Sequence, residues 1–174
     1  MTSIVVATDG SSSGENAVQV AADIAKARSA NVVVLSVIDN KPVPDSVRAM
    51  AKAEHLVGGE KLSAETSLLN VPTWMMKDLH AAAQADENVR LRTVVADLAV
   101  KKAHKILKAA GVTAVTEVEE NGNVADAIVT VADRVGADMI VMGSRGLGTL
   151  QSLVYGSTSR DVAKRAKCSC IAVT

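Results

Sequence analysis

The sequence has 174 residues, the length of one ordinary domain, and 48% of them are hydrophobic, enough to build a core. Its 19 basic and 19 acidic side chains leave no net charge, so there is no general basic surface for a nucleic-acid backbone. Trp74 and Tyr155 are the only aromatic residues, which argues against a platform that stacks bases. We therefore expect no nucleic-acid partner.

The first residues carry no secretory signal, because they lack a basic segment followed by a long apolar one. No window approaches the roughly 18 apolar residues that span a bilayer. Cys168 and Cys170 are too few for a disulfide framework, and we interpret them as reduced thiols in a short strand. A redox-sensitive interface is the alternative, and the sequence does not decide between the two. Together these features predict a cytoplasmic protein with no membrane partner.

The first part of the chain alternates between strand and helix patterns. Residues 4–7 form an apolar run that is typical of a strand covered on both faces. Residues 11–14 offer hydroxyl N-caps, and apolar residues then recur every three or four positions until the helix ends near Ser29. Residues 32–38 are the strongest buried-strand signal in the chain.

The second part repeats this alternation. We expect strands at 112–118, 139–142 and 169–173, a helix between Asn123 and Gly136, and a helix at 157–166. Such an order implies right-handed crossovers. It predicts an α/β fold of the Rossmann-like kind, an open five-stranded parallel sheet with helices on both faces.

Residues 40–86 are the least regular part of the chain but are too apolar for a disordered linker. We predict one domain over residues 1–174, with a helical insertion at about 40–86 that packs on the sheet or across a cleft. A long helix follows the insertion and ends at Gly111. Five apolar residues mark one face of that helix: Val94, Val95, Leu98, Ala99 and Ile106.

The predicted last strand, residues 169–173, lies at an edge of the sheet. An uncovered edge strand is prone to pair with other chains. Pairing with its own copy across a two-fold axis would remove that edge, so we expect a homodimer through this strand. A bulge or a covering loop is the alternative.

The loop after the fourth strand carries the clearest chemical signal. It contains Gly143-Ser144-Arg145-Gly146, then nine residues, then Gly156-Ser157-Thr158-Ser159 before a helix. Glycines allow a backbone to approach an anion, a helix N-terminus favours phosphate, and Arg145 adds a guanidinium. The pattern indicates a polyphosphate cradle or, alternatively, an ordinary glycine-rich turn with a Ser/Thr cap. It is neither a Walker A motif nor the glycine-rich turn of a dinucleotide fold.

Two further residues stand where ligands bind in such sheets, at the carboxyl ends of strands. Asp9 follows the first strand, where a carboxylate can accept a hydrogen bond from a ribose hydroxyl or an adenine amine; alternatively it caps the turn. Val37, near the end of the second strand, can offer backbone groups to an adenine edge or be a core valine.

At this point the chain resembles the universal stress protein family. The resemblance depends on residues 4–11, on Val37-Ile38-Asp39, and on Ala137-Asp138 leading into residues 139–143. Its most specific element is Gly143-x-x-Gly146, nine residues and Gly156-Ser157, which is similar to the signature of the family's ATP-binding branch. The resemblance covers residues 1–39 and 87–174 and leaves 40–86 unassigned.

The resemblance implies an adenine nucleotide alpha hydrolase-like sheet, dimers through the last strand, and bound ATP with Mg²⁺ or Mn²⁺ alongside. Asp9 would contact the nucleoside, Ala7 and Val37 would meet the adenine, and Gly143 and Gly146 would lie against ribose and phosphates. The implied nucleotide-binding set as a whole is Ala7, Thr8, Asp9, Val37, Met142, Gly143, Ser144, Arg145, Gly146, Gly156, Ser157, Thr158 and Ser159.

We expect a regulator or sensor of the stress response rather than an enzyme, because no general base is evident near the cradle. Its signalling partner is not indicated by the sequence. A slow ATPase or phosphotransferase that uses the insertion as a lid is one alternative, and an interaction module without nucleotide is another. His55, His80 and His104 are dispersed, so we expect no metal site made by protein side chains alone.

Overall fold

The computed structural model describes residues 2–38, 87–120, 123–146 and 156–174. The chain divides into two compact units, residues 1–40 with 95–174 and residues 41–94. The insertion predicted at 40–86 lies outside the described residues.

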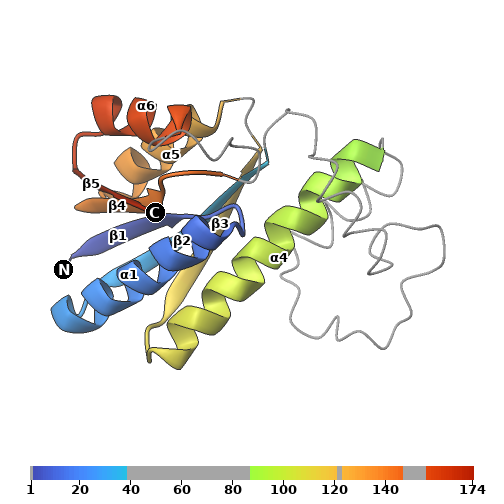
Figure 1. Cartoon of the computed structure of the whole chain (residues 1–174). Coiled ribbons are helices and arrows are strands. Elements are labelled where there is room, and N and C mark those ends of the chain that lie inside the picture. Colours follow the sequence, from blue (N-terminus) through green and yellow to red (C-terminus); the bar gives the residue numbers. More distant parts are fainter. Residues whose placement is uncertain (1, 39–86, 121–122, 147–155) are drawn as a thin grey trace. The chain divides into compact units, whose positions relative to one another are not determined.

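The first unit is built on a five-stranded parallel sheet with the order β3-β2-β1-β4-β5 (Figure 1). The strands are β1 (Ser3–Ala7), β2 (Asn31–Ile38), β3 (Ala114–Glu120), β4 (Met139–Gly143) and β5 (Ser169–Val173). The predicted open five-stranded parallel sheet is thus confirmed. β1 reads as a continuous apolar run because neighbouring residues face opposite covered sides: Val5 belongs to one core cluster, and Ile4 and Val6 to the other.

Helices cover both faces of the sheet. α1 (Ser12–Arg28) and the later part of α4 (Glu87–Ala109) contribute to one core cluster, and α5 (Val124–Val135) and α6 (Ser157–Arg165) contribute to the other (Figure 1). α1 begins after Ser11, whose side chain accepts from the Gly14 amide, and ends at Ser29 in the left-handed conformation. α5 begins after Asn123 and ends at Gly136, as predicted.

Two boundaries differ from the predicted ones. β3 begins at Ala114 rather than at 112, because the Val112 amide still bonds Leu107 O (2.9 Å) as α4 ends. β3 also runs to Glu120, since its pairing continues to the end of β2. The buried side of α4 is shifted as well, to Ala96, Ala99, Val100, Ala103 and Leu107.

The shift on α4 has a packing reason. Its core-facing side is rich in alanine and meets a cluster to which α1 also brings alanines, such as Ala21 and Ala25. Small side chains allow close packing, and the larger Val95 and Leu98 are left only half-buried. In the described part of the chain, no helix is long and apolar enough to cross a membrane.

Candidate functional site

The strand order places the loops after β1 and β4 next to each other. β1 pairs with β2 on one side and with β4 on the other, and Ala7 is in register with Met142 at the carboxyl ends of both strands. The chain places β2 and β3 on one side of β1, and β4 and β5 on the other, so the strand order switches between β1 and β4. Ligands of open α/β sheets bind at such a switch point.

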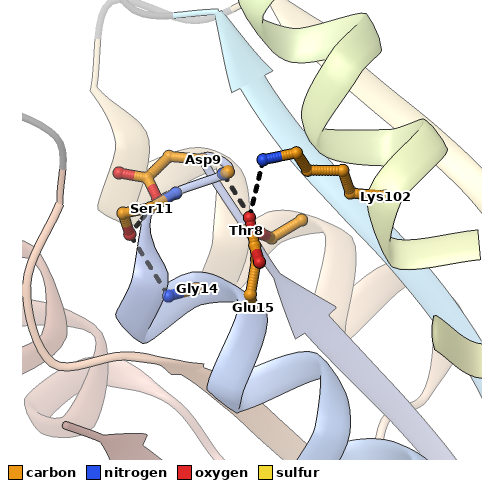
Figure 2. Close-up of polar contacts among 7 residues, drawn as sticks. Thr8, Asp9, Ser11, Gly14, Glu15 and Lys102 are labelled. Atoms are coloured by element: carbon orange, nitrogen blue, oxygen red, sulfur yellow. Dashed lines mark hydrogen bonds and ion pairs between the residues drawn. The ribbon is translucent and has the colours of Figure 1, made fainter.

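The loop after β1 is held by its own side chains (Figure 2). Asp9 Oδ1 accepts from both the amide (3.0 Å) and the hydroxyl (2.6 Å) of Ser11, and the Gly10 amide donates to Thr8 Oγ1 (3.2 Å). Ser11 Oγ in turn accepts from the Gly14 amide (3.2 Å) and so caps α1. Asp9 thus caps the turn through Oδ1, which is the alternative role that the sequence allowed. The two bonds from Ser11 hold the carboxylate in place.

The loop after β4 approaches the first loop so closely that side chains would not fit at two of its glycines. A Cβ on Gly146 would lie 2.8 Å from Asp9 Oδ2, and one on Gly143 would lie 2.8 Å from Ser13 Oγ. Ser13 Oγ donates a hydrogen bond of 2.6 Å to Arg145 O. The two loops are thus joined at both Asp9 and Ser13.

The start of α6 is fixed to the same loop. The Gly156 amide donates to Ser144 O (2.6 Å), and a Cβ on Gly156 would lie 2.9 Å from that oxygen. Gly156 is the N-cap of α6 and provides no side-chain cap, so the first helical amides receive no bond from it. The hydroxyl of Ser159, predicted as a phosphate contact, lies within hydrogen-bond distance of Ser144 O (3.3 Å) and Gly156 O (3.1 Å), to either of which it can donate its proton.

Two buried polar atoms of this loop have no hydrogen-bond partner among the described residues. They are Ser144 Oγ, in a residue that is 0% exposed, and Arg145 Nε. Buried polar groups are nearly always paired in native proteins. An unpaired hydroxyl and an unpaired guanidinium Nε beside glycine backbone are therefore suited to an oxygen-rich anionic ligand.

The remaining predicted site residues lie around this centre. Thr8, Ala7 and Met142 are buried at the strand ends, and Ala7 and Met142 belong to the core cluster beneath the loops. Val37 is half-buried near the end of β2 and packs against the same cluster. In the first turn of α6, Ser157 is exposed and Thr158 half-buried.

Ser11 and Ser13 have roles at this site beyond the helix capping that the sequence predicts for residues 11–14. Ser11 donates to Asp9 Oδ1, and Ser13 donates to Arg145 O. A signal was available, since several hydroxyl residues directly followed Asp9-Gly10 at a predicted strand end.

No group of three or more His, Cys, Asp or Glu side chains within the described ranges could hold a metal ion. On β5, burial raises the pKa of Cys170, and it likewise raises that of the adjacent Cys168. Both free cysteines are therefore protonated near neutral pH and are poor nucleophiles.

The fold and the site define an open parallel α/β domain with glycine- and serine-lined loops at its switch point. The sequence model of the universal stress protein family matches residues 1–174. The chain belongs to the universal stress protein family.

The stress response protein NhaX of Bacillus subtilis (strain 168) is 30% identical over 166 residues, which are 94% of this chain and 92% of NhaX. A universal stress protein of Archaeoglobus fulgidus superposes with a TM-score of 0.62 at 23% identity, covering 100% of this chain and 94% of that one. A universal stress protein solved in complex with cAMP has a TM-score of 0.59 at 25% identity, with 99% and 97% covered.

Proposed function

We propose that this protein binds an adenine nucleotide, ATP together with Mg²⁺ or Mn²⁺, at the switch point between β1 and β4. The observation that carries the proposal is that Ser144 Oγ and Arg145 Nε are buried and have no hydrogen-bond partner among the described residues. Both atoms belong to the loop after β4, which lies against Asp9 at Gly146. A cradle of backbone and hydroxyl groups with a guanidinium is what a polyphosphate requires. The solved relative at 25% identity that holds cAMP supports an adenine nucleotide as the ligand class.

The residues divide between the two ends of such a ligand. Asp9 has Oδ1 committed to Ser11 and is fixed where a carboxylate can accept from a ribose hydroxyl. Ala7, Thr8, Val37 and Met142 lie at the strand ends nearest a base. The phosphates would meet Gly143, Ser144, Arg145, Gly146, Gly156, Ser157 and Thr158, with Ser159 fixing the loop from behind. A divalent ion would neutralise phosphate charge and be held through phosphate and water oxygens.

We propose a regulatory role in the stress response, with little or no hydrolysis. Phosphoryl transfer to water needs a residue that positions the nucleophile at the γ-phosphate. In the described residues the only carboxylate in the joined loops is Asp9, which we assign to the nucleoside end. A slow ATPase that uses residues 40–86, outside the described residues, is the alternative.

We further propose a cytoplasmic homodimer formed through β5 (Ser169–Val173). β5 pairs with β4 on one side, and four of its five residues are half-buried, which suits a strand that gains a second neighbour.

The test begins with the protein as purified. Its adenine absorbance and the mass of any released ligand are recorded, and calorimetry then measures binding of ATP and GTP with Mg²⁺. Binding of ATP, with weaker binding of GTP, is the expected result. The control is Gly156→Val, whose side chain would collide with Ser144 O and should abolish binding. An unliganded protein that shows no heat and no thermal shift with ATP would leave the interaction module as the better reading.

A phosphate-release assay separates the regulator from the enzyme. Equal release by the wild type and by Gly156→Val supports the regulator, since any turnover then comes from contamination. Release that is lost in Gly156→Val supports the ATPase.

A further inference from the structure

We infer that Ser13 is a positioning residue for the phosphate end of the site, although it belongs to none of the proposed nucleotide contacts. The inference rests on the proposed function. It assigns to Ser13 the task of holding the peptide between Arg145 and Gly146 in the orientation that a polyphosphate meets.

The first step is the contact itself. Ser13 Oγ donates to Arg145 O at 2.6 Å across 132 residues of sequence, and Ser13 is only 8% exposed. Loss of the hydroxyl would leave this part-buried carbonyl without its donor, and an unsatisfied buried acceptor is costly.

The Ser13 hydroxyl reaches Arg145 because α1 packs closely on β4. The first turn of α1 lies directly against the end of β4: a Cβ on Gly143 would be 2.8 Å from Ser13 Oγ and 3.0 Å from the Gly14 amide nitrogen. The absence of a side chain at Gly143 therefore lets α1 deliver Ser13 to the loop beyond it. Gly143 thus has a role within the protein in addition to any contact with a ligand.

The third step follows the protons. Each serine hydroxyl has one proton to donate. That of Ser11 goes to Asp9 Oδ1 at 2.6 Å and that of Ser13 to Arg145 O at 2.6 Å, while the two hydroxyl oxygens lie 3.3 Å apart. With both protons placed in this way, none is left for the contact between the two serine oxygens, so Asp9 is held by Ser11 and Arg145 by Ser13 independently.

The consequence is specific to one end of the ligand. The bond at Arg145 O fixes a planar peptide whose other side is the amide of Gly146. The guanidinium of Arg145 starts from the same residue. Loss of the Ser13 hydroxyl should thus disturb groups that face phosphates, while Asp9 keeps its own bonds from Ser11 and stays in place for the nucleoside.

The experiment compares Ser13→Ala with Ser12→Ala, an exposed serine next to it on α1. Alanine is a good helix former and the cap at Ser11 is retained, so both variants should fold; thermal unfolding checks this. Calorimetry measures ATP and adenosine for each. We expect Ser13→Ala to weaken ATP about tenfold and adenosine hardly at all, and Ser12→Ala to change neither.

A second measurement needs no ligand. Hydrogen exchange of the amides at 144–146 should be faster in Ser13→Ala than in the wild type and unchanged in Ser12→Ala. An equal loss of ATP and adenosine affinity, or unchanged ATP affinity, overturns the inference. If the wild type binds neither ATP nor adenosine, the proposed function fails, and Ser13 then has no role in nucleotide binding. Exchange at 144–146 then still shows whether Ser13 holds the loop, and unchanged exchange overturns that as well.

Discussion

A Cβ built on Gly146 would lie 2.8 Å from Oδ2 of Asp9, although the two residues are 137 positions apart in the sequence. The carboxylate cannot easily turn away, because its other oxygen accepts two bonds from Ser11. This pair therefore sets the distance between the loop after β1 and the loop after β4. A change at either residue should be felt by a ligand bound between the strand ends.

Gly146→Ala should impair binding without unfolding the protein. The added methyl displaces Asp9 or the exposed loop, and a bound nucleotide would have to restore their positions against an overpacking cost of about 1–3 kcal/mol, so ATP affinity should fall about ten- to a hundredfold. Gly146 is exposed, so the melting temperature should change little. Calorimetry and thermal unfolding measure the two effects.

Gly111→Ala is the matched control, because it should lower stability and leave ATP affinity unchanged. Nothing lies within 4 Å of a Cβ at this position, but its φ of +77° is unfavourable for alanine, at a cost of about 1 kcal/mol. We expect a lower melting temperature and unchanged ATP affinity. Unchanged affinity in Gly146→Ala as well would show that the Asp9–Gly146 approach has no part in binding.

Asp9→Asn should weaken adenosine and ATP by the same factor. The amide oxygen can still accept from Ser11, so the loop is kept, but the charged acceptor for a ribose hydroxyl is lost. Bonds to charged groups contribute about 1.5–3 kcal/mol, so we expect at least about a tenfold loss for both ligands. Asp23→Asn, which removes one exposed charge from the middle of α1, is the control and should alter neither. A loss confined to ATP would place Asp9 at the phosphate end instead.

Much of the fold could be predicted because its strands are covered on both faces. Continuous apolar runs such as residues 32–38 are distinctive, and their alternation with helices limits the topology to parallel crossovers. The face of α4 was harder to predict, because Ala99 and Ala103 lie in the core and alanine contributes little to a hydrophobic pattern. The start of β3 depended on a helix-terminal bond of Val112, which no local pattern reveals.

The site, like the fold, has features that the sequence pattern indicates and contacts that it does not. Glycine spacing singled out Gly143, Gly146 and Gly156, and the structure shows close approach of other atoms at all three positions. The hydrogen bond from Ser13 to Arg145 has no signature in the sequence, because it joins residues that come close only through the strand order. The contact of the Ser159 hydroxyl with Ser144 O is equally invisible in the sequence, because it joins a helix start to the loop behind it.

Arg145→Met should trade affinity against stability. The guanidinium has a buried, unpaired Nε in the described structure, so its removal should leave the ligand-free protein as stable as before or more stable by up to about 1 kcal/mol. ATP affinity should fall at least about tenfold, with loss of part of its salt dependence, while adenosine binding stays unchanged. Arg28→Met, in the last turn of α1, controls for net charge. Strong destabilisation of Arg145→Met would mean that this side chain is structural.

The ion pair between Lys102 of α4 and Glu15 of α1 should contribute little to stability, despite its 2.8 Å distance (Figure 2). The two side chains are 58% and 39% exposed, so water screens them. A double-mutant cycle with Lys102→Met and Glu15→Gln should give a coupling of about 0.2–1 kcal/mol in chemical unfolding, decreasing at high salt. A larger coupling that resists salt would show that the pair fixes α4 against α1.

The stability of the protein should fall on acidification partly because of His104. Burial lowers the pKa of this histidine on α4 from its ordinary value of 6.5. The unfolded chain therefore takes up the proton first as the pH decreases, so the free energy of unfolding decreases below that value and is fully restored above it. Between about pH 7.5 and about pH 5, the wild type should lose more stability in urea unfolding than His104→Gln does. Because His55 and His80 are present in both proteins, the difference between the two curves isolates His104, and parallel curves would show that burial does not affect its protonation.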